Sequence, residues 1–429
     1  MVEYYTSELV FVEDHFEEGW FLGVEGDSIV SYSKELPPSG SIITNFGSFA
    51  IFPGCVNTHT HSFQSFLRGK ADGRNLGDWL NIVYSSAQNL GEEECYLAAL
   101  ISFGEMLKSG VTTVADFFYL NGKGNQNTCA VIQAALDLGI RLIMGRTFLD
   151  AEWGGPAAAE SLITAESRFR EIQKTYARHE KIIIAPAPHS IYGASREMIE
   201  AASNLAAEFG TKWFMHLADS RTSAEKIAKD YGNRSVELLH EWKVLTDAFV
   251  GIHAMWLSDE EITLLGQAGA CISHNPASNM MLGERIIDLP LIWASGIQVG
   301  LGTDGAASNN GLNIFRDARL AALCQTVRAG DPQVIQTRSI LNMITSDGGS
   351  VVGLPIGRLE TGYKADFMVI DIDDLSLQPR STLASNLVRS MTDRAIVHVY
   401  CGNEHVVKDG KLVNLDEKEI VHRARKYCT

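Results

Sequence analysis

The sequence contains no Cys-x-x-Cys pair, and its seven cysteines are scattered along 429 residues. An odd and dispersed set of this kind argues against a disulfide framework, and it predicts reduced thiols, most of them small residues of the core. The cysteines are Cys55, Cys95, Cys129, Cys271, Cys324, Cys401 and Cys428.

Long apolar runs are also missing. No run of apolar residues reaches the roughly 18 needed to cross a bilayer, and the chain does not open with a positively charged segment followed by an apolar one. We therefore expect neither a membrane-spanning helix nor a secretory signal. A soluble protein of the cytoplasm is predicted.

Positive charge is scarce as well. The 36 lysines and arginines stand against 52 acidic residues, which gives a net charge of −16. A surface this acidic repels phosphate backbones and anionic lipids. We expect neither nucleic acid nor a membrane as a partner.

What the sequence does have is a hydrophobic content of 45%, enough for a large core, and two strand-rich ends around a different middle. Short β-type runs broken by turns fill the first part of the chain, and similar runs return near the C-terminus. We predict one small β-sandwich domain built from residues 1–50 and 360–429. A second domain is predicted from residue 51 to residue 359.

In the middle of the chain, strand-like runs alternate with helix-length segments such as 92–108 and 259–267. With the apolar run that leads into Pro53 there are eight strand candidates. Eight βα units predict an α/β fold with a closed (β/α)8 (TIM) barrel. The other candidates are residues 112–116, 141–145, 181–186, 213–216, 248–253, 270–274 and 297–304.

The histidines gather at one position within these units. Of the twelve histidines, six lie at or just beyond the C-terminal end of a candidate strand, as does Asp304. Active sites of such barrels form at this face, so the placement predicts a catalytic centre. The six are His59, His61, His189, His216, His253 and His274.

The chemistry of these residue types suits a metal. His59 and His61 are two positions apart, so on a strand both imidazoles point to the same side. An isolated His-x-His pair is more often two solvated residues, and here the other strand-end histidines favour a ligand role. Three imidazoles and a carboxylate suit Zn2+ or Fe2+ with a position left for water, whose pKa the ion lowers from about 15.7 towards 7. Asp304, flanked by glycines in Gly302-Thr303-Asp304-Gly305, can touch the ion and accept the proton of that water.

Hydrolytic deamination also needs an acid that protonates a ring nitrogen and then the departing amine. Asp219 is the candidate, because it follows His216 by three residues in His216-Leu217-Ala218-Asp219. The alternative is an aspartate that caps a helix just after the strand.

Five segments carry a family resemblance: Pro53-Gly54 to His59-Thr60-His61, Leu67-Arg68-Gly69-Lys70-Ala71-Asp72, His216 to Asp219, Ser273 to Asn279, and Gly302 to Asn310. They resemble motifs of the amidohydrolase superfamily, in its cytosine-deaminase-like branch of enzymes that act on nitrogen heterocycles. The similarity runs nearly end to end. Within the branch the chain looks most like methylthioadenosine/S-adenosylhomocysteine deaminases and triazine hydrolases.

The resemblance implies one divalent ion per chain, zinc or alternatively iron, held by His59, His61, His216 and Asp304. It also implies that His253 orients the water or polarises the target, that Asp304 is the base, and that Asp219 shuttles the proton. The family usually has glutamate at this last position. Aspartate is one methylene shorter, so a displaced or water-bridged proton path is expected.

The same similarity suggests three substrate contacts. Asp78 aligns with an acidic residue that contacts ribose hydroxyls, and His189 aligns with a histidine that contacts the purine. Asp78 could equally be an aspartate at the start of a helix. His274 could line the pocket or form a hydrogen bond within the top of the barrel.

The expected function is metal-dependent hydrolytic deamination of an aminated nitrogen heterocycle, such as a purine, an adenosine derivative or a pterin, by metal-activated hydroxide. One alternative is the removal of a formimino or guanidino group, because Asn57 to Gly69 also resembles formiminoglutamate deiminases. Another is dechlorination or N-dealkylation of triazines. A barrel that only binds or scaffolds would be expected to lack a metal ligand, and none is missing. The expected partner is a small-molecule substrate, and a homodimer or a larger homo-oligomer is common among soluble enzymes.

Overall fold

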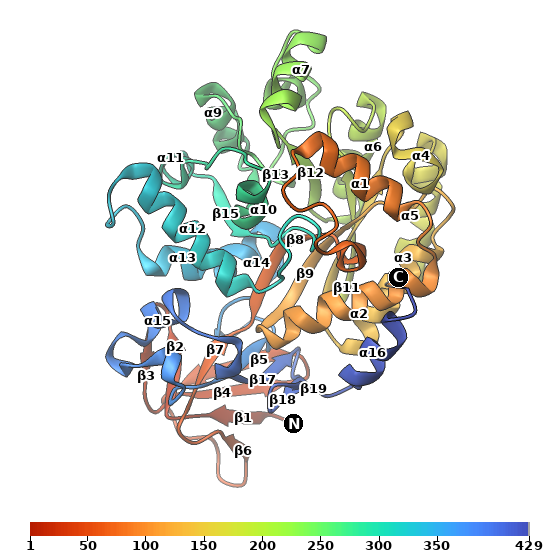
Figure 1. Cartoon of the computed structure of the whole chain (residues 1–429). Coiled ribbons are helices and arrows are strands. Elements are labelled where there is room, and N and C mark those ends of the chain that lie inside the picture. The colour runs from red at the N-terminus through yellow and green to blue at the C-terminus, as the bar shows by residue number, and fades with distance from the viewer. Residues whose placement is uncertain (428–429) are drawn as a thin grey trace.

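Parallel strands form the centre of the chain in the computed structural model, which describes residues 1–427 (Figure 1). They make two four-stranded arcs, β8–β9–β10–β11 and β12–β13–β14–β15, in which each strand pairs with the next. The strands are β8 (Cys55–Thr60), β9 (Val111–Phe118), β10 (Arg141–Phe148), β11 (Ile182–Pro188), β12 (Trp213–Leu217), β13 (Phe249–His253), β14 (Cys271–His274) and β15 (Gln298–Leu301).

Backbone hydrogen bonds join the two arcs at both seams. The N–H of His216 on β12 donates to the carbonyl of His189, just past β11, at 3.1 Å. The N–H of Asp304, just past β15, donates to the carbonyl of His59 on β8 at 3.0 Å. The predicted (β/α)8 barrel is thereby confirmed, and two of its seams run through strand-end residues singled out in the sequence.

Helices surround the barrel (Figure 1). Both predicted helical segments are present, as α2 (Glu92–Lys108) and α9 (Asp259–Ala268). Three glutamates open α2 and a lysine closes it, the charge order that stabilises the helix dipole. The other helices are α1 (Leu76–Ala87), α3 (Gln126–Leu138), α4 (Gly155–Ala158), α5 (Leu162–Tyr176), α6 (Arg196–Phe209), α7 (Arg221–Tyr231), α8 (Ser235–Glu241), α10 (Pro276–Met281), α11 (Leu289–Ala294), α12 (Ile314–Ala329), α13 (Thr337–Ile344), α14 (Ser346–Val352), α15 (Leu383–Arg389) and α16 (Glu417–Ala424).

Both ends of the chain build a pair of sheets that lies below the barrel in Figure 1. One sheet has the order β5–β4–β1–β6 and the other the order β19–β18–β17–β16–β7–β2–β3. Buried Tyr5, Leu22, Ile51, Phe367 and Tyr400 belong to the core between them, which confirms the predicted β-sandwich. The strands are β1 (Glu3–Thr6), β2 (Leu9–Val12), β3 (His15–Glu17), β4 (Phe21–Glu25), β5 (Ser28–Ser33), β6 (Ile42–Asn45), β7 (Phe49–Pro53), β16 (Phe367–Asp371), β17 (Ile396–Cys401), β18 (Glu404–Lys408) and β19 (Lys411–Leu412). The division of the chain at residues 50 and 360 stays a prediction.

The first barrel strand differs from the sequence prediction. The apolar run at 49–52 is β7, which pairs with β16 and β2 in the sandwich, and not the start of a barrel strand. Gly54 separates it from β8, and a Cβ on Gly54 would lie 2.4 Å from Oγ1 of Thr112. The chain can pass so close to β9 only because this residue is glycine. Apolar character alone could not show which of two sheets the run joins.

Two expectations concerned the cysteines and the length of apolar helices. The cysteines among residues 1–427 form no disulfide, and Cys428 lies outside the described residues. Within the same part of the chain, every helix is too short or too polar to cross a bilayer.

A buried ion pair connects the barrel to the sandwich. Arg141, the first residue of β10, donates to Oδ1 of Asp366 at 3.0 Å, and the two side chains are 2% and 0% exposed. The same oxygen accepts the N–H of Gly402 at 2.6 Å. Removing one member of such a pair leaves the other charge buried without a partner.

We therefore expect Asp366→Ala to lower the free energy of unfolding by about 3–5 kcal/mol. Glu404→Ala is the matched control, because Glu404 pairs with Lys181 at 2.6 Å between the same two parts of the chain but is 46% exposed. An exposed pair contributes at most about 1 kcal/mol. Urea unfolding measures the stability of both variants. Equal losses of unfolding free energy would show that the buried pair contributes no more than the exposed one.

Candidate active site

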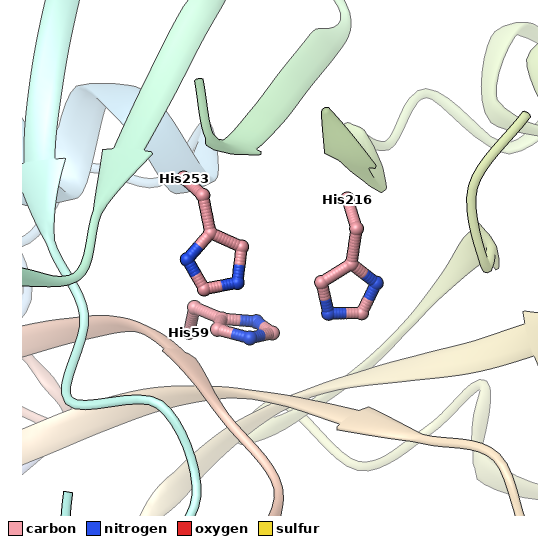
Figure 2. Close-up of side chains that lie close together, drawn as sticks. All are labelled: His59, His216 and His253. Carbon is pink, nitrogen blue, oxygen red and sulfur yellow. The ribbon is translucent and has the colours of Figure 1, made fainter. Parts of the chain in front are cut away.

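Four imidazoles and one carboxylate face a common point at the C-terminal end of the barrel strands. Figure 2 shows the rings of His59 on β8, His216 on β12 and His253 on β13 turned toward one another. His61 directly follows β8, and Asp304 lies three residues beyond β15. All five side chains are buried.

The distances between the donor atoms are short. Oδ1 of Asp304 lies 3.4 Å from Nε2 of His59 and 3.5 Å from Nε2 of His61. The donors form two groups that share His59, one with His61 and Asp304 and the other with His216 and His253. Within each group all donor atoms lie within 4.8 Å of one another. Two ligands of one ion, each at about 2.0–2.2 Å, lie at most about 4.4 Å apart, so the 3.4 Å and 3.5 Å separations around Asp304 fit a shared ion.

The imidazoles are oriented by their second ring nitrogen. Nδ1 of three rings lies beside an acceptor oxygen: His61 at 2.6 Å from the Phe117 carbonyl, His216 at 2.8 Å from the His189 carbonyl, and His253 at 2.9 Å from Oδ1 of Asn279. The partners of His61 and His216 only accept, and at His253 the 2.9 Å acceptor is closer than the Nδ2 of Asn275 at 3.5 Å, so Nδ1 carries the proton and the lone pair of Nε2 faces the cluster. Metal-binding histidines are held in the same way.

Asp304 is held by neighbouring donors as well. Oγ of Ser278 donates to its Oδ2 at 2.6 Å, and the N–H of Gly305 donates to its Oδ1 at 2.7 Å. The backbone of Asp304 has a φ of +59° and that of His253 a φ of +70°, a left-handed region that few residues other than glycine adopt. Conformations of this kind gather at functional sites, where the surrounding structure enforces them.

The electrostatics favour a metal-binding form of each group. Burial lowers the pKa of His61 to about 3, and the neighbouring His59 adds to the shift. Burial also lowers the pKa of His59 and of His216. Burial alone would raise the pKa of Asp304, but the adjacent imidazoles, that of His59 first, hold it well below its usual value. Neutral imidazoles and an ionised carboxylate are the forms that bind metal.

One buried atom of the cluster points to a cation. Nε2 of His59 has no hydrogen-bond partner within residues 1–427. A buried polar atom without a partner is costly, and coordination to an ion would satisfy it. The cluster, which combines imidazoles with a carboxylate, thus fits a divalent ion such as zinc or iron, and the narrower set of His59, His61, His216 and Asp304 stays a prediction.

A cavity lies against the cluster and brings together three kinds of side chain. The metal-site end is formed by His61, His216, His253 and Asp304, and Asp219 lies on the wall. An aromatic wall is formed by Trp79, Tyr84, Tyr119, His189 and Tyr192, and the rest is apolar: Leu76, Leu80, Met255 and Leu282.

Asp219 is not the cap of the helix that follows it. The N-cap of α7 is Ser220, whose side chain accepts the N–H of Ser223. The carboxylate of Asp219 instead accepts hydrogen bonds from the Tyr192 hydroxyl and from Oγ of Ser223, both at 2.5 Å. The structure therefore excludes the capping alternative and places this acid in the cavity wall.

The three predicted substrate contacts lie in different surroundings. His189 lines the cavity, with its Nε2 2.9 Å from the Tyr84 hydroxyl. Asp78 is exposed in the first turn of α1, where it bonds to the N-cap Asn75 and does not line the cavity. His274 is buried at the end of β14, away from the cavity lining, and neither ring nitrogen has a partner among the described residues. Their contacts with substrate stay predictions.

Four side chains that support the cluster received no role from the sequence. Ser278 and Asn279 belong to the segment Ser273 to Asn279, whose polarity directly after a strand was the available signal. Tyr84 and Tyr192 had no such signal, because they reach the cavity from a helix and from a loop.

Comparison with known proteins agrees with this geometry. The model of the amidohydrolase family matches residues 50–413. A 5'-deoxyadenosine deaminase from Methanopyrus kandleri is 35% identical over 376 residues, 87% of this chain and 85% of that protein. The chain belongs to the amidohydrolase family. As an amidohydrolase it is a metal-dependent hydrolase that acts on carbon–nitrogen bonds other than peptide bonds.

Other relatives of this amidohydrolase cover most of its length. A 5-methylthioadenosine/S-adenosylhomocysteine deaminase from Pyrococcus furiosus is 31% identical and covers 93% of each chain. An adenosine deaminase from Xanthomonas campestris, solved with zinc, has a TM-score of 0.90 at 24% identity and covers 99% of this chain and 97% of that one. An atrazine chlorohydrolase from Arthrobacter aurescens TC1, also solved with zinc, has a TM-score of 0.92 at 24% identity, with 99% and 100% covered. These solved structures show the same fold.

We expect Ser278→Ala to lower metal affinity or kcat by about 10–100-fold, because it removes the donor that fixes Oδ2 of Asp304. Ser295→Ala is a suitable control, since Oγ of Ser295, the C-cap of α11, bonds among residues 1–427 only to the Leu291 carbonyl. Competition with a chromophoric chelator measures metal affinity, and a steady-state assay measures kcat. If both serine variants behave alike, Ser278 has no influence on the cluster.

Proposed function

We propose that this amidohydrolase removes the amino group of a nitrogen heterocycle of the adenosine type, using one divalent ion per chain, zinc or alternatively iron. The observation that carries the proposal is the meeting of a metal donor set and an acid in one cavity. His59, His61, His216 and Asp304 supply the donors, and Asp219 supplies the acid. The names of the relatives from Methanopyrus kandleri and Pyrococcus furiosus support an adenosine-type ring.

The reaction adds water to the carbon that bears the amino group and breaks the carbon–nitrogen bond. A bound ion supplies hydroxide near neutral pH by lowering the pKa of water to about 7. Asp304, oriented by Ser278, accepts the proton of the attacking water. His253, fixed through its Nδ1 by Asn279, accepts a hydrogen bond at Nε2 and orients that water.

Asp219 carries the second half of the proton transfer. It protonates the ring nitrogen next to the attacked carbon, takes up the proton of the hydroxyl group that the attack leaves on this carbon, and passes that proton to the departing amine, which leaves as ammonia. The proton that Asp304 took from the water returns to Asp219 through solvent, which restores both carboxyl groups. The aromatic wall offers flat faces for the ring and excludes water. Formimino or guanidino removal would use the same donors on an acyclic substrate, and triazine dechlorination would use them with another leaving group.

The metal can be tested directly. Purified protein is expected to hold about one equivalent of zinc or iron per chain, because the protein donors gather in one cluster. Chelation should abolish turnover, and added metal should restore it. Undiminished turnover in protein shown to be metal-free by elemental analysis would contradict the mechanism.

The roles of Asp219 as acid and Asp304 as base can be distinguished by the amount of metal that each variant binds. Asp219→Asn should lower kcat by about 10²–10⁴-fold and leave bound metal unchanged, because the amide keeps the shape of the carboxylate but cannot relay a proton. Asp304→Asn should lower kcat at least as far and also lower bound metal, because it removes an anionic ligand. Near-normal kcat in Asp219→Asn would remove this residue from the mechanism.

Ammonia release tests the substrate class. The panel contains 5'-deoxyadenosine, guanine, a pterin, cytosine, an aminotriazine and formiminoglutamate. Release from the purine nucleoside above the others supports the proposal. Release from formiminoglutamate alone, or chloride release from a chlorotriazine, would replace it with one of the two alternatives.

A further inference from the structure

Asp219 is held from two sides by elements that follow different barrel strands. Tyr192 comes from the loop after β11 and donates to Oδ2, while Ser223 comes from the first turn of α7 and donates to Oδ1. Both oxygens of the carboxylate are therefore occupied by donors. We call Tyr192 and Ser223 the clamp of Asp219.

Close contacts surround the backbone on the tyrosine side of the clamp. Nε1 of Trp153 donates to the Tyr192 carbonyl at 3.3 Å, and the Trp153 ring packs edge-on against His189, with centroids 5.1 Å apart. A Cβ on Gly193 would lie 2.9 Å from Nδ1 of His189 and 3.0 Å from the Trp153 ring. Only glycine allows the chain to fold this tightly behind Tyr192.

The serine side is a short chain of hydroxyl groups. Oγ of Ser220 donates to Oγ of Ser223 at 2.9 Å, and Oγ of Ser223 donates to Asp219. Hydrogen bonds in series polarise one another, which strengthens the last one. The first turn of α7 also presents the positive end of the helix dipole to the carboxylate.

We propose that Tyr192 and Ser223 are positioning residues that hold Asp219 at the depth in the cavity where it can exchange a proton with the substrate. The inference rests on the proposed function, since it takes Asp219 to be the acid. A short side chain has few rotamers, and donors on both oxygens leave it one orientation. The clamp fits aspartate, and a glutamate at 219 would extend its carboxylate by one methylene past both donors.

The first test removes each donor. Tyr192→Phe and Ser223→Ala are each expected to lower kcat by about 10–100-fold, the worth of a hydrogen bond to a charged group, with little change in KM and in bound metal. Ser223→Thr keeps the hydroxyl and should rescue most of the loss. Tyr96→Phe is the matched control, because the Tyr96 hydroxyl donates to Oδ2 of Asp137 at 2.7 Å between α2 and α3.

The second test asks whether the clamp acts through Asp219. In the Asp219→Asn background, Tyr192→Phe and Ser223→Ala should each change kcat by less than about threefold, because residues that act as one unit are not additive. Asp219→Glu should lower kcat even though it retains a carboxylic acid. A full loss from either clamp variant in the Asn background, or a gain of kcat in Asp219→Glu, would overturn the inference.

The clamp and the proposed function can fail separately. If no compound of the panel releases ammonia, the proposed function is wrong, and the single and double variants are compared by their midpoints of urea unfolding instead. If the double variant of Tyr192→Phe and Asp219→Asn loses less than the sum of the two single losses, the clamp is supported. Additive midpoints overturn it.

Discussion

The contact between Asp304 and β8 is the one on which the rest of the structure depends. Its N–H bonds to the carbonyl of His59, and its carbonyl accepts the hydroxyl of Thr60 at 2.9 Å. The same residue closes the seam between the last and the first barrel strands and supplies the carboxylate of the donor cluster. Closing the barrel and assembling the site are thus a single event.

This seam tolerates little change in volume. A Cβ on Gly302 would lie 2.2 Å from Oδ1 of Asn275 and 2.9 Å from the backbone nitrogen of His59. A Cβ on Gly305 would lie 2.0 Å from Oε1 of Gln64. The two glycines around Asp304 are required by space, because a side chain at either position would keep β8 and the segment after β15 apart.

Much of the architecture follows from local patterns in the sequence. Apolar runs of strand length predicted β9 to β15. The histidines at the ends of these runs could be assigned to one site, because parallel strands of a barrel place their C-terminal ends on one face. The assignment of residues 49–52 to the barrel was wrong because β7 pairs with β16, which lies more than 300 residues further along the chain. Pairing at that distance leaves no local signal.

The side-chain contacts were harder to foresee. Asp78 stays outside the cavity because Leu76, Trp79 and Leu80 occupy the inward face of α1, a matter of helical phase. The capping alternative for Asp219 fails because Ser220, one residue on, takes the cap. Contacts such as that of Tyr192 with Asp219 join loops of neighbouring units, and only the closed barrel brings those loops together.

The division of the barrel into two arcs has a consequence for its unfolding. His59 and His61 belong to the first arc, whereas His216 and Asp304 belong to the second. An ion bound by all four would add a non-covalent cross-link between the two halves. Because ligand affinity for the native state adds to its stability, the loaded barrel should unfold as one cooperative unit at conditions where metal-free halves begin to separate.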